Sequence, residues 1–244
     1  MNISARFLAL ALIAVPAVPV LAATPVAAAG PVTVARYTFD RGAPAGKVAE
    51  NSGRGVPLTV RTADRGTVRF PALGGGKYAG LPTRCLKTAT VCPKALLEGA
   101  DDPDLDPGIR RFTWAASVRV SKAQLAGSAN VVQKGVATTE SQWKLQVGLK
   151  NGRAQCVAVG RGSPKAYVAR SAAGIADGRW HKVLCQRSGT SLTVSVDGAV
   201  KGRTVVPAAM SILNNKPLRI GGPNFHTTRD MFHGDVDDVY AQLG

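Results

Sequence analysis

Apolar and polar residues alternate along most of the chain with the period of a β-strand. In the segment 112–120 every second side chain is apolar, and polar residues such as Thr113 and Arg119 lie between them. The segments 143–150 and 192–196 show the same alternation. A period of two predicts strands that pack one face on a core.

Turn residues separate these segments. Asn151–Gly152 and Asp197–Gly198 are typical of two-residue hairpin turns. Eight further strands are predicted at 32–39, 57–61, 67–70, 130–134, 166–171, 180–187, 218–221 and 232–240. About a dozen short strands without a long helical pattern predict an all-β, antiparallel sandwich or barrel.

The segment 81–108 interrupts the alternation. It holds four prolines, two cysteines and the acidic run ADDPDLDPG. Pro103 and Pro107 prevent the carboxylates from lying along one regular face. We therefore expect a surface loop pinned by a disulfide.

The N-terminus has the pattern of an export signal. Arg6 precedes an apolar run from Phe7 to Leu21, and an A-x-A cleavage pattern follows at Ala27–Ala29, with a second candidate site after Ala22. The sequence thus predicts a secretory signal peptide at 1–29 and one extracellular domain at 30–244. No later segment is apolar for long enough to predict a transmembrane anchor.

Export favours disulfides for the four cysteines. Cys85 and Cys92 enclose six residues, whereas Cys156 and Cys185 each lie in a strand-like run. We expect the pairs Cys85–Cys92 and Cys156–Cys185, although four cysteines allow three connectivities. A metal site at Cys185 and His181 is disfavoured, since residues four apart in a strand lie roughly 13 Å apart.

The chain is strongly basic, with 31 Lys and Arg against 15 Asp and Glu, a net charge of +16. A basic face would attract polyanions through a salt-sensitive interaction. The alternative is that these residues only keep a secreted domain soluble. Aromatic residues are only 5% of the chain and no nucleic-acid motif is present, so nucleic acid is not favoured as a partner. The cations predicted to be exposed are Arg119, Lys144, Lys150, Arg161, Lys165, Arg170, Lys201 and Arg203.

Three segments together resemble the laminin G-like domain of the concanavalin A-like lectin/glucanase superfamily, in the form found in secreted bacterial proteins. They are ARYTFDRG with ENSGRGVPLTV, DGRWHKVLCQRSGTSLTVSVDGAVKG, and FHGDVDDVYAQ. The resemblance implies a two-sheet jelly-roll sandwich. It also suits a Cys156–Cys185 bridge between adjacent strands. Trp180 and His181 are expected to serve the structure, as a core or rim anchor and a partly buried, hydrogen-bonded histidine.

In this fold class the first and last strands commonly pair. Val236 and Val239 are three apart, so both can face the core only through a β-bulge, which would redirect the two aspartates between them.

The same pairing would bring Asp40 near Asp235, Asp237 and Asp238. Carboxylates and freed carbonyl groups suit calcium, and the resemblance implies a structural Ca²⁺ ion held by these four residues. The alternative is that the four aspartates pair with arginines.

The superfamily also contains glycoside hydrolases, whose Glu-x-Asp-x-x-Glu strand carries the nucleophile and the acid. The nearest run here, Asp235–Tyr240, lacks both glutamates, and Glu50, Glu98 and Glu140 lie in predicted loops. We therefore expect a secreted, non-catalytic recognition module for extracellular glycans or cell-surface proteins. The alternative is a glycoside hydrolase with an atypical active site. No ligand-binding residue is identified by sequence alone.

Overall fold

The computed structural model describes Met1 and residues 30–85, 88–125, 127–137, 140–148, 150–163, 165–226 and 230–244. Apart from Met1, the predicted signal peptide lies outside these residues.

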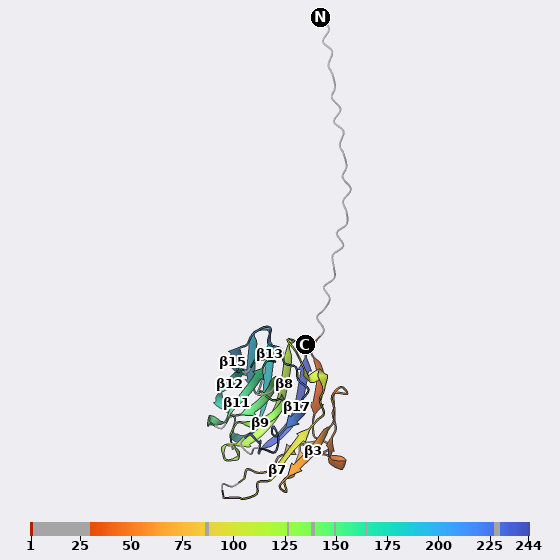
Figure 1. Cartoon of the computed structure of the whole chain (residues 1–244), viewed down its shortest axis with the longest axis vertical. Coiled ribbons are helices and arrows are strands. Elements are labelled where there is room, and N and C mark those ends of the chain that lie inside the picture. The colour runs from red at the N-terminus through yellow and green to blue at the C-terminus, as the bar shows by residue number, and fades with distance from the viewer. Residues whose placement is uncertain are drawn as a thin grey trace.

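Two antiparallel sheets face each other across one core (Figure 1). The first has the order β1-β17-β8-β13-β14-β15, with β6 also paired to β17. Its strands are β1 Val32–Tyr37, β6 Ala79–Gly80, β8 Phe112–Ser121, β13 Asp177–Ser188, β14 Ser191–Val196, β15 Ala199–Val205 and β17 Asp235–Leu243.

The second sheet has the order β12-β11-β10-β9-β16-β7-β3-β2. Its strands are β2 Lys47–Val48, β3 Leu58–Ala63, β7 Lys94–Glu98, β9 Ala129–Gly135, β10 Gln142–Val147, β11 Arg153–Val159, β12 Ala166–Gly174 and β16 Leu218–Ile220. A separate small hairpin pairs β4 Ala72–Leu73 with β5 Gly76–Lys77. The predicted all-β, two-sheet sandwich is confirmed.

Helical structure among the described residues is limited to four 3-10 turns, at Pro44–Gly46, Pro103–Leu105, Lys122–Gln124 and Lys150–Gly152. In the described part of the chain, no helix has the length and apolar character needed to cross a bilayer.

The core is built from the alternating residues that the pattern indicated. Phe112, Trp114 and Trp143 are fully buried, and their ring centroids lie 5.3–5.7 Å apart. Trp114 comes from the first sheet and Trp143 from the second, so this aromatic cluster joins the two layers. Truncating one of these rings to alanine typically costs about 3–5 kcal/mol.

Of the two predicted two-residue hairpin turns, Asp197–Gly198 is confirmed between the paired residues Val196 and Ala199, whereas Asn151–Gly152 lies in a longer loop that is closed by a 2.9 Å hydrogen bond from the Gly148 N–H to the Arg153 carbonyl oxygen. Asn151 and Gly152 have φ of 69° and 59°, and Asp197 and Gly198 have φ of 51° and 82°. Two successive positive φ angles between directly paired strands characterise the type I′ turn, which Asp197–Gly198 forms; at Asn151–Gly152 the same angles occur within the 3-10 turn Lys150–Gly152.

The expectation for 81–108 is wrong in part. Residues Lys94–Glu98 form β7, which pairs with β3 and β16 and buries Ala95, Leu96 and Leu97. A strand covered on both faces has a continuous apolar run instead of alternation. Conversely, the predicted strand at 67–70 is reduced to a single bridge between Arg69 and Gly80.

The first and last strands pair as predicted, with Val32 opposite Leu243. The register of β17 against β8 shifts between Asp237 and Tyr240, and Asp238 has a φ of 42°. Val236 and Val239 are both buried, which confirms the predicted bulge.

Both expected disulfides form, Cys85–Cys92 and Cys156–Cys185. The second does not join adjacent strands, because Cys156 lies in β11 of one sheet and Cys185 in β13 of the other. Both side chains point into the core and are fully buried, so the bridge crosses between the layers. The expectation of adjacent strands is therefore corrected to facing sheets.

Candidate functional site

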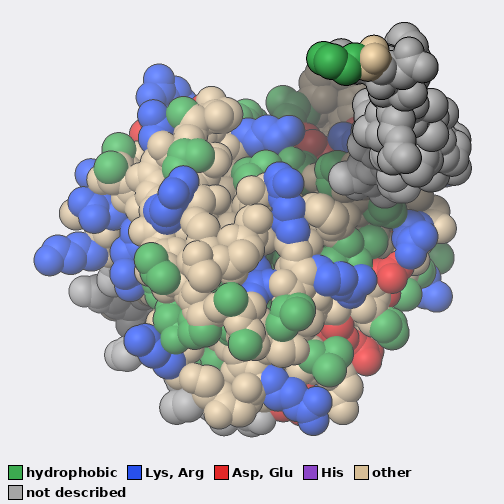
Figure 2. All heavy atoms as spheres, turned by 90° about the horizontal axis from the view of Figure 1, so that it is seen from above, with side chains coloured by type: hydrophobic (Ala, Val, Ile, Leu, Met, Phe, Trp, Pro, Cys, Tyr) green, Lys and Arg blue, Asp and Glu red, His purple; other side chains and the backbone are tan. Residues whose placement is uncertain are grey.

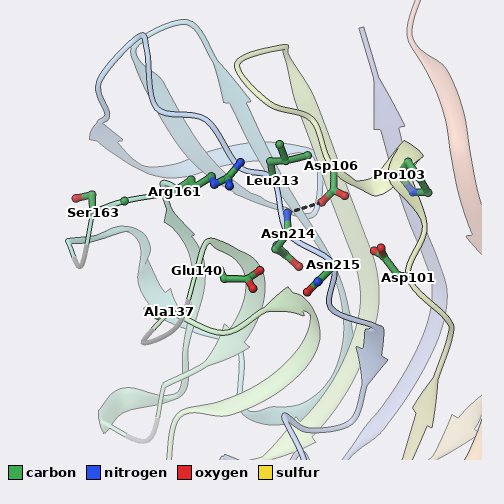
Figure 3. A pocket seen from close by; sticks show the side chains of 11 residues that line it. Asp101, Pro103, Asp106, Ala137, Glu140, Arg161, Ser163, Leu213, Asn214 and Asn215 are labelled. Atoms are coloured by element: carbon green, nitrogen blue, oxygen red, sulfur yellow. Dashed lines mark hydrogen bonds between the residues drawn. The ribbon is translucent and has the colours of Figure 1, made fainter.

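A pocket of about 800 Å³ lies where several loops meet at the ends of strands β9, β10 and β11 of the second sheet (Figure 3). Its walls come from the segment before β8, the connection between β9 and β10, the turn between β11 and β12, and the segment before β16. The lining residues are Asp101, Pro103, Asp106, Ala137, Glu140, Arg161, Gly162, Ser163, Leu213, Asn214 and Asn215.

One buried cation holds the acidic segment against the sheet. The Lys134 side chain is completely buried, and its ammonium nitrogen lies 2.8 Å from Asp101 Oδ1 and 2.7 Å from Asp106 Oδ1. It also donates a 2.6 Å hydrogen bond to the carbonyl oxygen of Asn214. Burial raises the pKa of Asp106, while the hydrogen bond and charge of Lys134 oppose that rise. Lys134 thus ties two pocket walls to β9.

The Asn214 wall is held by a second set of hydrogen bonds. Its amide nitrogen Nδ2 donates to the carbonyl oxygen and to Oγ of Ser141, at 3.2 and 3.3 Å, and its backbone N–H donates to Asp106 Oδ1 at 3.2 Å. Gly135 lies directly behind, with a φ of +87°, and a Cβ there would lie 2.0 Å from the Ser141 carbonyl oxygen. These contacts give the pocket a preformed wall.

The remaining polar side chains are available to a ligand. Figure 3 shows Glu140 and Asn215 entering the same space from opposite walls, with Arg161 beyond them. Among the described residues, the Glu140 carboxylate has one polar partner, Lys216, in a long ion pair at 3.5 Å. Carboxylate, amide and guanidinium groups beside the apolar surface of Leu213 form a mixed lining. Such a lining can exchange hydrogen bonds with hydroxyl groups and cover the apolar face of a sugar ring.

The sequence did not indicate this pocket. The acidic run was expected to be a plain surface loop, but Asp102 and Asp106 are buried. Pro103 begins a 3-10 turn, and Asp102 Oδ1 accepts a 3.0 Å hydrogen bond from the backbone N–H of Asp104. The segment therefore folds into a turn that buries Asp102 and Asp106, and it is not a plain surface loop. Only Lys134, which follows Val131 and Val132 in a predicted strand, could have hinted at a buried acidic partner.

Two of the four aspartates predicted to bind calcium are paired with arginines. Asp235 lies 2.9 Å from Arg119 Nε, and Asp238 lies 2.9 Å from Arg36 Nε. For these two carboxylates, the structure agrees with the alternative that the aspartates pair with arginines and do not bind calcium.

Asp237 and Asp40 are close enough to interact electrostatically. Burial raises the pKa of Asp237, and the charges of Asp238 and Asp40 raise it further against an opposing hydrogen bond from the Asp238 amide. Among the residues described, no three His, Cys, Asp or Glu side chains are grouped to hold a metal ion. An ion at Asp40 and Asp237 would need backbone carbonyl groups for most of its six to eight ligands. Calcium binding stays a prediction.

Arg119 does not belong to a free basic face. Its guanidinium carbon lies 4.9 Å from the ring centroid of Trp180 and 5.0 Å from that of Tyr78, whose rings meet edge to face. Arg119 Nη2 also donates a 2.9 Å hydrogen bond to the Tyr78 hydroxyl. Lys144 is likewise half-buried, and desolvation lowers its pKa. The predicted outward basic positions on β8 and β10 are therefore largely engaged or covered.

His181 is held between two carboxylates. Its Nδ1 lies 2.8 Å from Asp197 Oδ2, and its Nε2 lies 3.1 Å from Asp177 Oδ1. Burial by itself would lower the pKa of His181, but the two aspartates outweigh it and raise the pKa above its usual value. The histidine links the start of β13 to the Asp197–Gly198 turn.

Comparisons with known proteins agree with this architecture. A family model described as "Concanavalin A-like lectin/glucanases superfamily" matches residues 99–241. No curated protein matches the chain significantly.

Among solved structures, domain 4 of AbnA, a GH43 extracellular arabinanase from Geobacillus stearothermophilus in complex with arabinotriose, is similar with a TM-score of 0.65 and 16% identity. That match covers 88% of this chain and 93% of that domain.

The binding domain of Paraclostridial Mosquitocidal Protein 1 has a TM-score of 0.62 and 12% identity, and covers 86% of this chain and 48% of that one. The binding domain of botulinum neurotoxin DC in complex with rat synaptotagmin II has a TM-score of 0.60 and 11% identity, with the same coverage. This chain thus spans about half the length of the two toxin domains. At these identities the likeness shows the fold alone.

Proposed function

Because this chain belongs to the concanavalin A-like lectin/glucanases superfamily, we propose that it is an extracellular recognition module that binds a neutral oligosaccharide in the pocket between Glu140 and Asn215. Export through the predicted signal peptide would place it outside the cell. The two disulfides are consistent with an oxidising compartment.

The observation that carries this proposal is the preformed polar pocket. Its walls are already ordered by Lys134, Asp106 and Asn214, so a ligand would not have to organise them. Preorganised polar groups reduce the entropic cost of binding.

The charges of the pocket favour a neutral ligand. Lys134 binds Asp101 and Asp106, which leaves Glu140 and Arg161 as opposite charges on the open walls. A strongly anionic ligand would meet the carboxylates, and a cation would meet Arg161. Hydroxyl groups can donate to the carboxylate and accept from the guanidinium.

The similar structures support a binding role in general terms. One is recorded with arabinotriose, and two others are named as binding domains. These descriptions apply to those proteins, and they make arabinotriose a reasonable first probe alongside a wider panel of neutral oligosaccharides.

Isothermal titration calorimetry after a glycan-array screen tests the proposal. We expect Glu140→Gln and Asn215→Ala each to weaken binding of the selected oligosaccharide by about 10-fold, since each removes a charged or polar contact worth roughly 1.5 kcal/mol. Asp64→Asn is the matched control, because Asp64 is an exposed carboxylate that pairs with Lys94 at 3.0 Å outside the pocket lining. Unchanged affinity in both pocket variants would refute this location.

We further propose that the module does not hydrolyse its ligand. Asp235 and Asp238, in the run nearest to a hydrolase motif, are each bound to an arginine. No reducing sugar should accumulate during long incubation with the selected oligosaccharide. If hydrolysis were measured and Asp237→Asn abolished it at an unchanged melting temperature, the alternative of an atypical glycoside hydrolase would replace this proposal.

A further inference from the structure

Two long stretches of the sequence contain no acidic residue. The segment 141–176 holds six Lys and Arg, and the segment 198–229 holds five, whereas neither contains an Asp or Glu. The first segment includes β12 and the second includes β15.

The fold brings these two segments together. β12 is the edge strand of the second sheet and β15 is the edge strand of the first, and the two strands lie against each other on one side of the sandwich (Figure 1). Their close approach depends on Gly202, because a Cβ at this position would lie 1.9 Å from the Arg170 carbonyl oxygen. The two segments that lack acidic residues thus lie side by side at one edge of the sandwich.

Four cations on this edge are exposed and free of ion pairs. Lys165 and Arg170 lie at β12, and Lys201 and Arg203 lie on β15. Within the part of the chain that the structure describes, none of the four forms a salt bridge, whereas twelve such contacts occur elsewhere. Figure 2 shows Lys and Arg side chains projecting on the side where Figure 1 places these strands, and acidic side chains mainly on the other side.

We propose that this β12–β15 edge binds a linear anionic polymer of the extracellular surface, with sulfate, phosphate or carboxylate groups along its length. The cations are spread along two extended strands of seven and nine residues, or about 20–30 Å, instead of converging on one point. A small anion would contact one or two of them, but an extended polymer can contact all four. Lys165 follows the pocket-lining residues Arg161–Ser163, whereas Arg170, Lys201 and Arg203 lie away from the Glu140 pocket, so binding at this edge does not rest on the proposed function.

The charge of the whole protein would also attract a polyanion, so the test must separate local from global charge. The quadruple variant K165Q/R170Q/K201Q/R203Q removes four charges from the β12–β15 edge. The control K47Q/R54Q/R61Q/R65Q removes four charges from exposed residues on and around β2 and β3, at the opposite edge of the second sheet. Both variants have the same net charge.

Binding to heparin and to inorganic polyphosphate is measured over a range of salt concentrations. We expect the edge variant to bind both probes at least 10-fold more weakly at about 0.1 M salt, and its slope of log affinity against log salt to fall by about 3, as counterion release predicts for four lost contacts. The control should change affinity less than 3-fold.

Equal losses of affinity in the two variants, or an unchanged salt slope in the edge variant, would overturn the proposal. Tighter binding of duplex DNA than of heparin at equal salt would overturn it in favour of nucleic acid.

The neutral oligosaccharide selected for the pocket provides an internal control. Its affinity should be unchanged in R170Q/K201Q/R203Q, which keeps Lys165 beside the pocket-lining Ser163, and an unchanged melting temperature shows that the quadruple variant is folded. Loss of the polyanion with retained sugar binding separates the two surfaces, and either proposal can fail without the other.

Discussion

Lys134 and Asp106 form a buried ion pair, with 2.7 Å between the ammonium nitrogen and Oδ1, beneath the candidate binding pocket. The two residues are 28 positions apart, one on a strand and one at the end of a proline-flanked turn. This ion pair and the hydrogen bond from Lys134 to the Asn214 carbonyl oxygen together hold two pocket walls on β9.

Removing one member of the pair should destabilise the whole domain. A charge left buried without its partner typically costs 3–5 kcal/mol, so Lys134→Met should lower the melting temperature by roughly 10 °C or more on the scaling for domains of this size. Arg54→Met breaks the exposed pair with Asp104 and should cost at most about 1 kcal/mol. Urea unfolding of both variants measures the difference, and equal small losses would contradict the structural role of Lys134.

His181 should make stability depend on pH. Its pKa is raised in the folded state, so its contribution is fully present below the unfolded value of about 6.5 and is lost as the pH rises through the higher folded value. His181→Gln should therefore be more destabilising at pH 5.5 than at pH 9.

Urea unfolding at the two pH values tests this, with NMR titration of the imidazole as a direct check. His226→Gln is the control because that histidine is exposed. The same loss of stability at both pH values would show that the imidazole acts only through packing.

The two disulfides should differ in their effect on stability. Cys156–Cys185 spans 29 positions and Cys85–Cys92 spans seven. The chain-entropy model gives about 3–4 kcal/mol for the longer loop and about 2–3 kcal/mol for the shorter one. The variant C156A/C185A should thus melt at a lower temperature than C85A/C92A, and the reverse order would contradict the model.

Calcium is the remaining prediction from the acidic end of β17. Free calcium at a hundredfold excess over its dissociation constant would stabilise the domain by roughly 2.7 kcal/mol, a shift of several degrees. Asp40→Asn and Asp237→Asn should each abolish the shift. Asp235→Asn should leave it intact, because that carboxylate binds Arg119. Identical melting curves in millimolar calcium and in chelator would show that the domain does not bind calcium there.

Local sequence rules predicted the features that depend on near neighbours. The three-residue spacing of Val236 and Val239 required the bulge, and the Asn-Gly and Asp-Gly pairs required positive φ angles. These follow from backbone geometry within a few residues. Alternation also identified β8, β10 and β14, whose apolar side chains pack on the core.

The candidate site escaped prediction because it depends on contacts between distant segments. Nothing near Lys134 in the sequence indicates that Asp101 and Asp106 neutralise it. Arg187 is similar: it is buried on β13 and donates hydrogen bonds to backbone carbonyl groups, including those of Arg110 and Ala208. Such partners are set by tertiary packing, which a single sequence does not reveal.

The pairing of β1 with β17 bears on how fast the domain folds. Val32 and Leu243 are adjacent in space although more than 200 residues separate them in the chain, and closing so long a loop slows folding. A circular permutant that connects residue 244 to residue 31 through a short linker, and opens the chain at the Asn151–Gly152 turn, would convert this pairing into a local hairpin. The cut makes the β10–β11 pairing the long-range one in exchange, so the overall contact order does not fall, and faster refolding with an unchanged sheet order would show that closing β1 on β17 limits the folding rate.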